Sequence, residues 1–316
     1  MKTMHAFRFN DSPESPDLIP VEMEIPSPGP GERLIRIHAA GVTPTELVWY
    51  PTTHILEGGP RHGAIPGHEF SGIVAAVGPD ASPEEIGRPV FGMNDWFASG
   101  ATAEYCLAPA TSLASKPSRL SHAEAAAVPI GALTAWQGLI ERAGVRAGER
   151  VLIHGGSGAV GVFAIQFARQ AGAHVVTTAS PRNFPFLADL GANETLDYRT
   201  VKLEDLGASF DVIFDAVGGE TLLRSWALLR PGGRMVTIAA DSEGTQDERT
   251  KSAFFIVEPN GPQLEEISRL LEAGTLRVFV DAEVPMSQAA AAYGNRAENR
   301  KGRGKVVLVQ EDESSS

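Results

Sequence analysis

Cysteine is almost absent from this chain of 316 residues, in which Cys106 is the only one. A single cysteine excludes an intrachain disulfide and any metal site that needs several cysteine ligands. No apolar run approaches the ~20 residues that cross a bilayer, and the N-terminus shows no charged-then-apolar signal pattern. We therefore expect a soluble, cytoplasmic protein with no membrane partner.

Positive charge is also in short supply. The chain has 27 Lys and Arg residues against 39 Asp and Glu residues, which gives a formal net charge of −12. This balance argues against a broad nucleic-acid-binding surface, so no nucleic-acid partner is expected. It is compatible with an anionic cofactor, because a few backbone amides and one cation can hold a phosphate group.

The most informative stretch runs from Val151 to Ala179 and reads VLIHGGSGAVGVFAIQFARQAGAHVVTTA. An apolar, β-branched run enters a glycine-rich turn, a helical stretch follows, and a second apolar run closes the unit. Gly156, Gly158 and Gly161 fit G-x-G-x-x-G, which allows a tight turn, close approach of the backbone to a pyrophosphate, and packing of helix on strand. The sequence predicts a dinucleotide site with its phosphates at the helix N-terminus; the alternative is a βαβ unit whose glycine turn binds nothing.

The end of the second apolar run indicates which dinucleotide binds. An NAD site places Asp or Glu there, but this strand runs out into TASPR (Thr178–Arg182), and the nearest acid, Asp189, lies on the next helix. Hydroxyls and a guanidinium can hold a ribose 2′-phosphate, which a carboxylate would repel. We therefore expect NADPH as the cofactor; the alternative is that Arg182 is only a solvated arginine at a helix start.

The sequence up to about residue 120 reads as a β-rich region. Short apolar runs alternate with turns rich in Gly, Pro and Asp, which is typical of a small, rolled-up, mostly antiparallel domain. The pattern changes after Leu120, where Ser121 and Glu124 have the spacing of a capping box. The expected strands are Arg33–Ala39, Gly72–Val77, Pro89–Gly92 and Ala103–Leu107, and the expected helices are His122–Val128 and Ala132–Ala143.

Strands then alternate with helices, which predicts a parallel, doubly wound α/β sheet. Its expected strands are Val151–Ile153, His174–Ala179, Glu194–Asp197, Asp211–Ala216 and Arg234–Ala239, with Phe254–Val257 as a possible edge strand. A helix (Gln263–Glu272), a strand (Leu276–Val280), a helix (Ser287–Asn295) and a last strand (Lys305–Val309) are expected to follow. The polar tail Glu311–Ser316 is expected to be frayed.

Several segments together resemble the medium-chain dehydrogenase/reductase superfamily, in its zinc-independent NADPH:quinone oxidoreductase-like branch. The resemblance implies a Rossmann-type nucleotide-binding domain (122–260) inserted in a β-rich, GroES-like catalytic domain (1–121 plus 261–316), with a cleft at their junction. It also implies a homodimer formed through edge strands of the Rossmann domains, with Phe254–Val257 as the edge. The segments are AAGVTPTEL, IPGHEFSGIVAAVG, AAAVPIGALTAW, the glycine turn, TASPRN, LGANETLDY, FDVIFDAVGG and GRGKVVL.

The resemblance also implies cofactor contacts. Ser180, Arg182 and Tyr198 resemble a cluster around the 2′-phosphate, while Phe254 and Phe255 are expected either to wall the nicotinamide or to belong to the core. The remaining implied contacts lie in the glycine turn, at strand ends and at a lysine near the cofactor: Thr134, Gly156, Ser157, Gly158, Ala159, Val160, Gly161, Thr178, Val217, Ile238 and Lys305.

The zinc enzymes of this family carry a Cys–His–Thr–Asp stretch, a Gly-His-Glu and a third ligand. Here the first stretch reads Thr43–Pro44–Thr45–Glu46, and the region of the third ligand reads AAVP (126–129). His68 and Glu69 are retained, but catalytic zinc needs three protein ligands and an open position. We therefore expect no bound metal, and expect His68 either to be held by hydrogen bonds within the fold or to face the substrate.

Without a metal, the expected chemistry is hydride transfer from NADPH to a quinone or an α,β-unsaturated carbonyl, because these acceptors need only positioning and one or two hydrogen-bond donors. The candidate catalytic residues are Thr43, Thr45 and Tyr50, with His68 behind them. Tyr50 is included because related enoyl reductases use a tyrosine from this loop, although the spacing does not match cleanly. Two alternatives stay open: an alcohol dehydrogenase with a degraded zinc site, and a non-catalytic NADPH-binding redox sensor.

Overall fold

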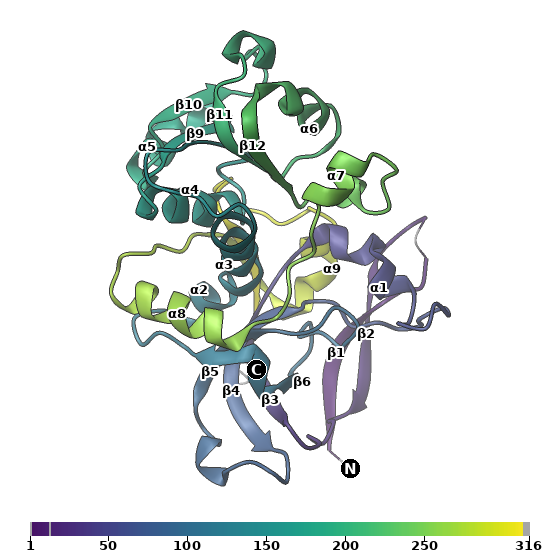
Figure 1. Cartoon of the computed structure of the whole chain (residues 1–316). Coiled ribbons are helices and arrows are strands. Elements are labelled where there is room, and N and C mark those ends of the chain that lie inside the picture. Colours follow the sequence, from purple (N-terminus) through teal and green to yellow (C-terminus); the bar gives the residue numbers. More distant parts are fainter. Residues whose placement is uncertain (1, 13, 312–316) are drawn as a thin grey trace. The chain divides into compact units, whose positions relative to one another are not determined.

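The computed structural model describes residues 2–12 and 14–311. The chain forms two compact units: one comprises Met1–Ile130, Pro259–Lys301 and Lys305–Ser316, and the other comprises Gly131–Glu258 with Gly302–Gly304 (Figure 1). We call these the β-rich unit and the nucleotide unit. Of the tail that the sequence predicts to be frayed, residues 312–316 lie outside the described part. None of the described helices is long and apolar enough to cross a membrane.

The β-rich unit is built on one large sheet. Its strand order is β13-β14-β3-β4-β5-β7, and β6 pairs with β3. Most neighbours are antiparallel, as the alternating pattern predicts, while β13 and β14 run parallel. A separate antiparallel hairpin, β1 (Thr3–Phe9) with β2 (Leu18–Glu24), is not predicted by the sequence. The sheet strands are β3 (Glu32–Gly41), β4 (Glu69–Val77), β5 (Pro89–Met93), β6 (Tyr105–Pro109), β7 (Leu113–Ser115), β13 (Val280–Pro285) and β14 (Lys305–Val309).

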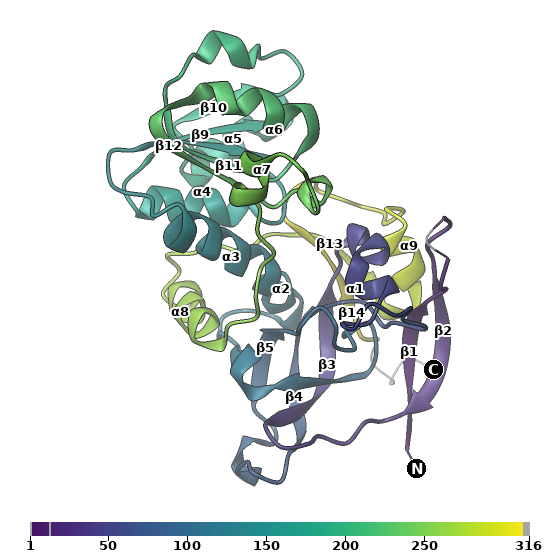
Figure 2. The same ribbon diagram turned by 45° about the vertical axis from the view of Figure 1, so that its right-hand side comes forward.

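Short helices cover this sheet. The capping box that starts α2 (His122–Ala126) is confirmed, because the Glu124 amide donates to Ser121 Oγ (3.1 Å) and the Ser121 amide donates to Glu124 Oε2 (2.8 Å). Alanines of α2 pack on the sheet beside Val307, where small side chains allow a close approach. The other helices of this unit are α1 (Tyr50–Thr53), α8 (Gly261–Glu272) and α9 (Ala289–Tyr293) (Figure 2).

The nucleotide unit contains the predicted doubly wound sheet. In the described part of the chain its parallel strands have the order β10-β9-β8-β11-β12, so the sequence of strands reverses direction between β8 and β11. Open α/β sheets bind ligands at such a switch point, beyond the carboxyl ends of the strands. The strands are β8 (Arg150–His154), β9 (His174–Ala179), β10 (Glu194–Asp197), β11 (Phe210–Asp215) and β12 (Leu229–Thr237).

Helices flank this parallel sheet. They are α3 (Pro129–Trp136), a π-helical turn (Gln137–Arg142), α4 (Gly161–Gln170), α5 (Phe184–Leu190), α6 (Gly219–Ser225) and α7 (Glu248–Ala253). The segment Gly302–Gly304 joins the unit from far along the chain: the Gly304 amide donates to the Ser157 carbonyl (3.0 Å), and Gly304 forms a β-bridge with Gly158. The glycine turn is therefore supported by a neighbour from near the C-terminus.

Two sequence-predicted strands differ from the structure. Leu276–Val280 is not a strand; the Thr275 and Leu276 amides donate to the Leu270 carbonyl at the end of α8, and the strand begins at Val280. Phe254–Val257 makes only one bridge, between Phe254 and Thr237, because α7 ends there and the Phe254 amide still donates to the Thr250 carbonyl. In both cases a preceding helix takes up backbone groups that a strand would need.

Candidate functional site

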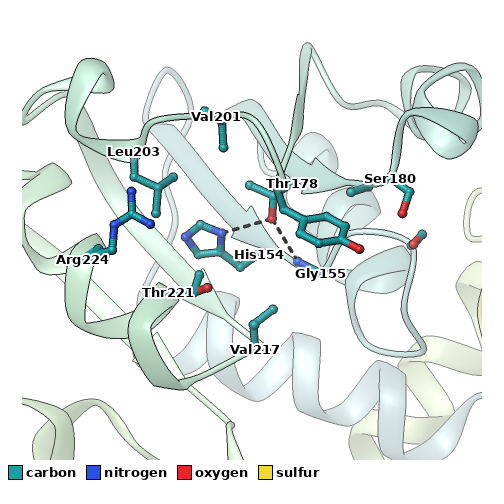
Figure 3. A pocket seen from close by; sticks show the side chains of 12 residues that line it. His154, Gly155, Thr178, Ser180, Val201, Leu203, Val217, Thr221 and Arg224 are labelled. Carbon is teal, nitrogen blue, oxygen red and sulfur yellow. Dashed lines mark hydrogen bonds between the residues drawn. The ribbon is translucent and has the colours of Figure 1, made fainter.

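A pocket of about 280 Å³ lies at the switch point of the nucleotide unit. It is formed where β8, β9, β10 and β11 end, together with α6 (Figure 3). Five predicted cofactor residues line it: Ser157, Thr178, Ser180, Tyr198 and Val217. Its other lining residues were missed by the sequence analysis: His154, Gly155, Ala179, Val201, Leu203, Thr221 and Arg224.

Close contacts around the turn between β8 and α4 account for its glycines. A Cβ at Gly161 would overlap the Gly155 carbonyl and the Gly156 backbone, and a Cβ at Gly156 would overlap the Thr177 hydroxyl. Gly158 is different: its nearest neighbour would be the Gly155 carbonyl oxygen at 3.3 Å, and the residue is exposed. Gly161 thus lets α4 begin close to the turn, Gly156 makes room for Thr177 of β9, and Gly158 leaves the backbone open to a ligand.

The N-terminus of α4 suits an anion. Its N-cap residue is Val160, which makes no side-chain cap hydrogen bond. The first amides of a helix otherwise need a cap, water or a ligand, and the helix dipole favours a negative group there. The turn with Gly156, Ser157, Gly158, Ala159, Val160 and Gly161 therefore fits the pyrophosphate of a dinucleotide.

His154 is linked to this turn by hydrogen bonds through Thr178. Ser225 donates its hydroxyl hydrogen to the Thr221 carbonyl (2.6 Å), so the His154 Nε2 must donate to Ser225 Oγ (2.9 Å). The His154 Nδ1 is then left to accept from the Thr178 hydroxyl (3.1 Å), which itself accepts from the Gly155 amide (3.3 Å). These bonds select one neutral tautomer, and burial lowers the pKa of His154 to about 4.

The ribose end of the pocket lacks an acid. Among the described residues that line the pocket there is no carboxylate, whereas the Ser180 and Tyr198 side chains bring hydroxyl groups. Arg182 is exposed and does not line the pocket; its guanidinium lies against Gly302. The cation that does line it is Arg224, which donates to both carboxylate oxygens of Glu204 (2.7 and 2.8 Å).

Five further predicted cofactor residues do not line this pocket. Thr134 is buried in α3, and Ile238 follows β12 with its amide bonded to the Asp215 carbonyl (3.1 Å). Phe254 is half-buried, and Phe255 is buried with the Arg142 guanidinium over its ring at 4.6 Å. These four residues belong to the nucleotide unit, whereas Lys305 belongs to the β-rich unit.

A second polar group of residues is buried in the β-rich unit; we call Thr43, Glu46, His68, Glu69 and Lys305 the buried polar cluster. The carboxylate of Glu69 is fully buried and forms an ion pair with Lys305, whose Nζ donates to Thr43 Oγ1 at 2.9 Å. The other Glu69 oxygen accepts from the Ile130 amide (2.9 Å). Sequence reasoning singled out Thr43, His68 and Lys305 but missed the roles of Glu46 and Glu69.

The sequence makes room for this buried ion pair. A Cβ at Gly41, the last residue of β3, would overlap the Glu69 carboxylate. Burial raises the pKa of Glu69, while Lys305 and the Ile130 amide act in the opposite direction and Glu46 adds to the rise. Because Lys305 is also buried, the pair stabilises each partner against an otherwise costly desolvation.

His68 is fixed by two oxygen acceptors. Its Nδ1 contacts Glu46 Oε1 and its Nε2 lies 3.2 Å from the Ala98 carbonyl. Both ring nitrogens therefore already have an oxygen partner within the β-rich unit. The structure therefore shows His68 hydrogen-bonded within the fold.

The remaining catalytic candidates lie at the surface. Thr45 is exposed, and Tyr50 is 44% exposed with its ring stacked on His54 at 4.3 Å. The described contacts thus bring Thr43 and His68 into the buried polar cluster, and leave Thr45 and Tyr50 outside it. In residues 2–12 and 14–311, no group of three or more His, Cys, Asp or Glu side chains is arranged to hold a metal ion.

Comparisons with known proteins agree with this architecture. Residues 29–118 match the model of the alcohol dehydrogenase GroES-like domain, and residues 190–308 match that of a zinc-binding dehydrogenase domain. A probable mitochondrial zinc-binding oxidoreductase of Arthroderma benhamiae is 34% identical over 90% of this chain and 91% of its own length. A 2-methylene-furan-3-one reductase of Solanum lycopersicum is 31% identical over 96% of this chain and 79% of its own.

A solved structure gives the same result. The quinone oxidoreductase of Coxiella burnetii has a TM-score of 0.84 and 29% identity, covering 98% of this chain and 99% of that one. With a parallel nucleotide-type sheet, a GroES-like unit and relatives along nearly its whole length, the chain belongs to the medium-chain dehydrogenase/reductase superfamily and is an oxidoreductase of the kind that uses a nicotinamide cofactor.

Proposed function

We propose that the protein is an NADPH-dependent reductase that transfers a hydride to a quinone or an α,β-unsaturated carbonyl compound without a catalytic zinc ion. The observation that carries the proposal is the switch-point pocket. There the glycine turn leads into α4, which has no side-chain cap, and β9 ends without a carboxylate. A carboxylate at that end would repel the 2′-phosphate that distinguishes NADPH from NADH. The hydroxyls of Ser180 and Tyr198 are suited to donate hydrogen bonds to this phosphate.

When bound, the nicotinamide supplies the hydride. The chain's own residues bind and orient: backbone amides of the glycine turn hold the pyrophosphate, and His154 fixes the Thr178 hydroxyl beside it. Arg224, the cation that lines the pocket, adds a positive charge near the 2′-phosphate. In the β-rich unit, Thr43 offers a hydroxyl to the acceptor oxygen.

The donor set supports a reaction without zinc. His68 and Glu69 are retained from the zinc enzymes, but both His68 ring nitrogens face protein oxygens and Glu69 is paired with Lys305. Thr43, which stands where the zinc enzymes have a cysteine, is hydrogen-bonded to the same lysine. Quinones and conjugated enones accept a hydride without a Lewis acid when they are well positioned. The names of two relatives fit these substrate classes, since 2-methylene-furan-3-one is a conjugated enone and the Coxiella burnetii protein is a quinone oxidoreductase.

Turnover assays test this function directly. We expect protein purified without chelators to oxidise NADPH with a panel of quinones and enones, to prefer NADPH over NADH, and to contain no stoichiometric zinc. Arg224→Ala should weaken NADPH binding and leave NADH binding as it was, because only NADPH carries the 2′-phosphate. Stoichiometric zinc would instead favour the alcohol dehydrogenase reading, and tight NADPH binding without turnover would favour a redox sensor.

A further inference from the structure

We propose that Glu69, Lys305 and Thr43 form a proton-delivery chain, in which Lys305 recharges the Thr43 hydroxyl after that hydroxyl protonates the reduced acceptor. The inference rests on the proposed reductase function. Lys305 Nζ contacts Glu69 on one side and donates to Thr43 Oγ1 on the other, at 2.9 Å. Lys305 is only 6% exposed and Glu69 is fully buried, whereas Thr43 is partly exposed. The chain therefore leads from the interior to a reachable hydroxyl.

The hydrogen-bond direction makes Thr43 the end of this chain. An ammonium group has only hydrogens to give, so Thr43 Oγ1 must be the acceptor of the bond from Lys305. The hydroxyl's own hydrogen then remains to donate, and a positive charge behind the oxygen makes that hydrogen more acidic. Glu69 is the positioning residue that holds the ammonium there, with its second oxygen anchored by the Ile130 amide (2.9 Å).

The proton step balances as follows. Hydride addition to the β-carbon of a conjugated enone leaves an enolate oxygen with an extra electron pair. This oxygen takes the proton of Thr43, whose O–H bond breaks while a new O–H bond forms with a proton from Lys305. The enol is released neutral, and the oxidised nicotinamide carries away the positive charge left by the hydride. Water then protonates the Thr43 oxygen while the Thr43 hydrogen passes back to the Lys305 amine, which restores the ammonium.

Quinones give an internal comparison. Hydride addition to a quinone leaves a hydroquinone anion, whose charge is delocalised over an aromatic ring and which water can protonate after release. An enolate is a stronger base and benefits more from a proton delivered in the site. The chain should therefore matter more for enones than for quinones.

The test compares Thr43→Val with Thr43→Ser. With saturating NADPH and an enone, Thr43→Val should lower kcat on the order of 100-fold, the usual contribution of a positioned general acid, while Thr43→Ser restores most of it. The melting temperature of Thr43→Ser and the NADPH affinity of both variants should equal those of the wild type, and the loss of kcat with a quinone should be much smaller. The wild-type kcat with the enone should carry a solvent deuterium isotope effect.

Lys305 is tested with its partner removed as well, because Lys305→Met alone would leave a buried, unpaired carboxylate. The double variant Glu69→Gln/Lys305→Met should fold and lose kcat with the enone as Thr43→Val does, and Lys305→Arg should recover part of it. The solvent deuterium isotope effect on kcat with the enone should be smaller in the double variant than in the wild type. Thr111→Val, an exposed threonine of the same unit, is the matched control.

Several outcomes would overturn the chain. The first is a kcat of Thr43→Val with the enone that equals that of the wild type. The second is a kcat that falls as far in Thr43→Ser as in Thr43→Val. The third is a kcat that falls in Thr45→Val and not in Thr43→Val. A loss that accompanies a lowered melting temperature in both Thr43 variants would reduce the cluster to a structural role. If the wild type reduces neither enones nor quinones with NADPH, the reductase function itself fails, which is a separate result from any of these.

Discussion

His154 occupies a position where a charged ring would be destabilising. It is buried, 1% exposed, and both ring nitrogens are engaged by hydroxyl groups in a pattern that only the neutral ring satisfies. Sequence reasoning did not single out this histidine, which directly follows the predicted strand Val151–Ile153. The rule that ligands bind at the carboxyl ends of strands would have found it, since it is the last residue of β8.

The depressed pKa of His154 predicts a pH-dependent stability. The unfolded chain binds a proton below about pH 6.5 and the folded protein only near its pKa of about 4, so stability is lost as pH falls between these values. Linkage gives a loss of roughly 2 kcal/mol between pH 7 and pH 5 from this residue alone. Urea unfolding at several pH values measures it.

The variant His154→Gln should unfold with a shallower pH dependence than the wild type. His5→Gln is the control, because this histidine is exposed on β1. His122, whose pKa burial also lowers to about 4, retains its own contribution in both variants. Parallel stability curves for His154→Gln and the wild type would show that the ring does not stay neutral in the fold.

At the scale of elements, the turn between β8 and α4 separates two uses of glycine. Gly161→Ala places a methyl group against the Gly155 carbonyl and should lower the stability by about 1–3 kcal/mol, as overpacking does, and weaken NADPH binding as well. Gly158→Ala meets only one atom, at 3.3 Å, and should retain the melting temperature while weakening NADPH binding. Thermal unfolding and fluorescence titration distinguish the two; equal melting temperatures for both variants would contradict this division.

The sequence was informative wherever one local pattern decided an element. The strands at Glu194–Asp197 and Lys305–Val309 and the capping box before α2 were predicted as observed, because the alternation of strands with helices and the chemistry of a cap are both visible within a few residues of sequence. The strand predicted at Leu276–Val280 was wrong because the end of α8 competes for the same backbone groups. Such competition depends on neighbours that a window of sequence does not contain.

Candidate sites divide in the same way. The strand-turn-helix pattern and the superfamily resemblance were enough to predict the glycine turn, Thr178, Ser180 and Tyr198 as part of the site. Val201, Leu203 and Arg224 come from a loop and a helix without a motif, so only the folded chain shows that they line the pocket. The pairing of Lys305 with Glu69 spans most of the chain and has no local signal.

For the whole molecule, we infer a homodimer formed through the edge of the nucleotide sheet. β12 is the edge strand, Phe254 bridges to Thr237 in it, and Ile256 is 46% exposed beside that bridge. Light scattering of the wild type should give twice the mass of one chain, which is 33.5 kDa. Ile256→Lys should shift the measured mass towards that of the monomer. Leu56→Lys, at a more exposed apolar residue of the other unit, should remain dimeric; a monomeric wild type would rule out the dimer.

The pairing of Gly304 with Ser157 and Gly158 bears on how this protein can be dissected. An excised fragment running from Gly131 to Glu258 would lack three residues of its own fold, and they are the ones that support its phosphate-binding turn. Such a fragment would need a fused copy of Gly302–Gly304, or the rest of the chain supplied in trans, before its affinity for a nucleotide could be compared with that of the intact protein.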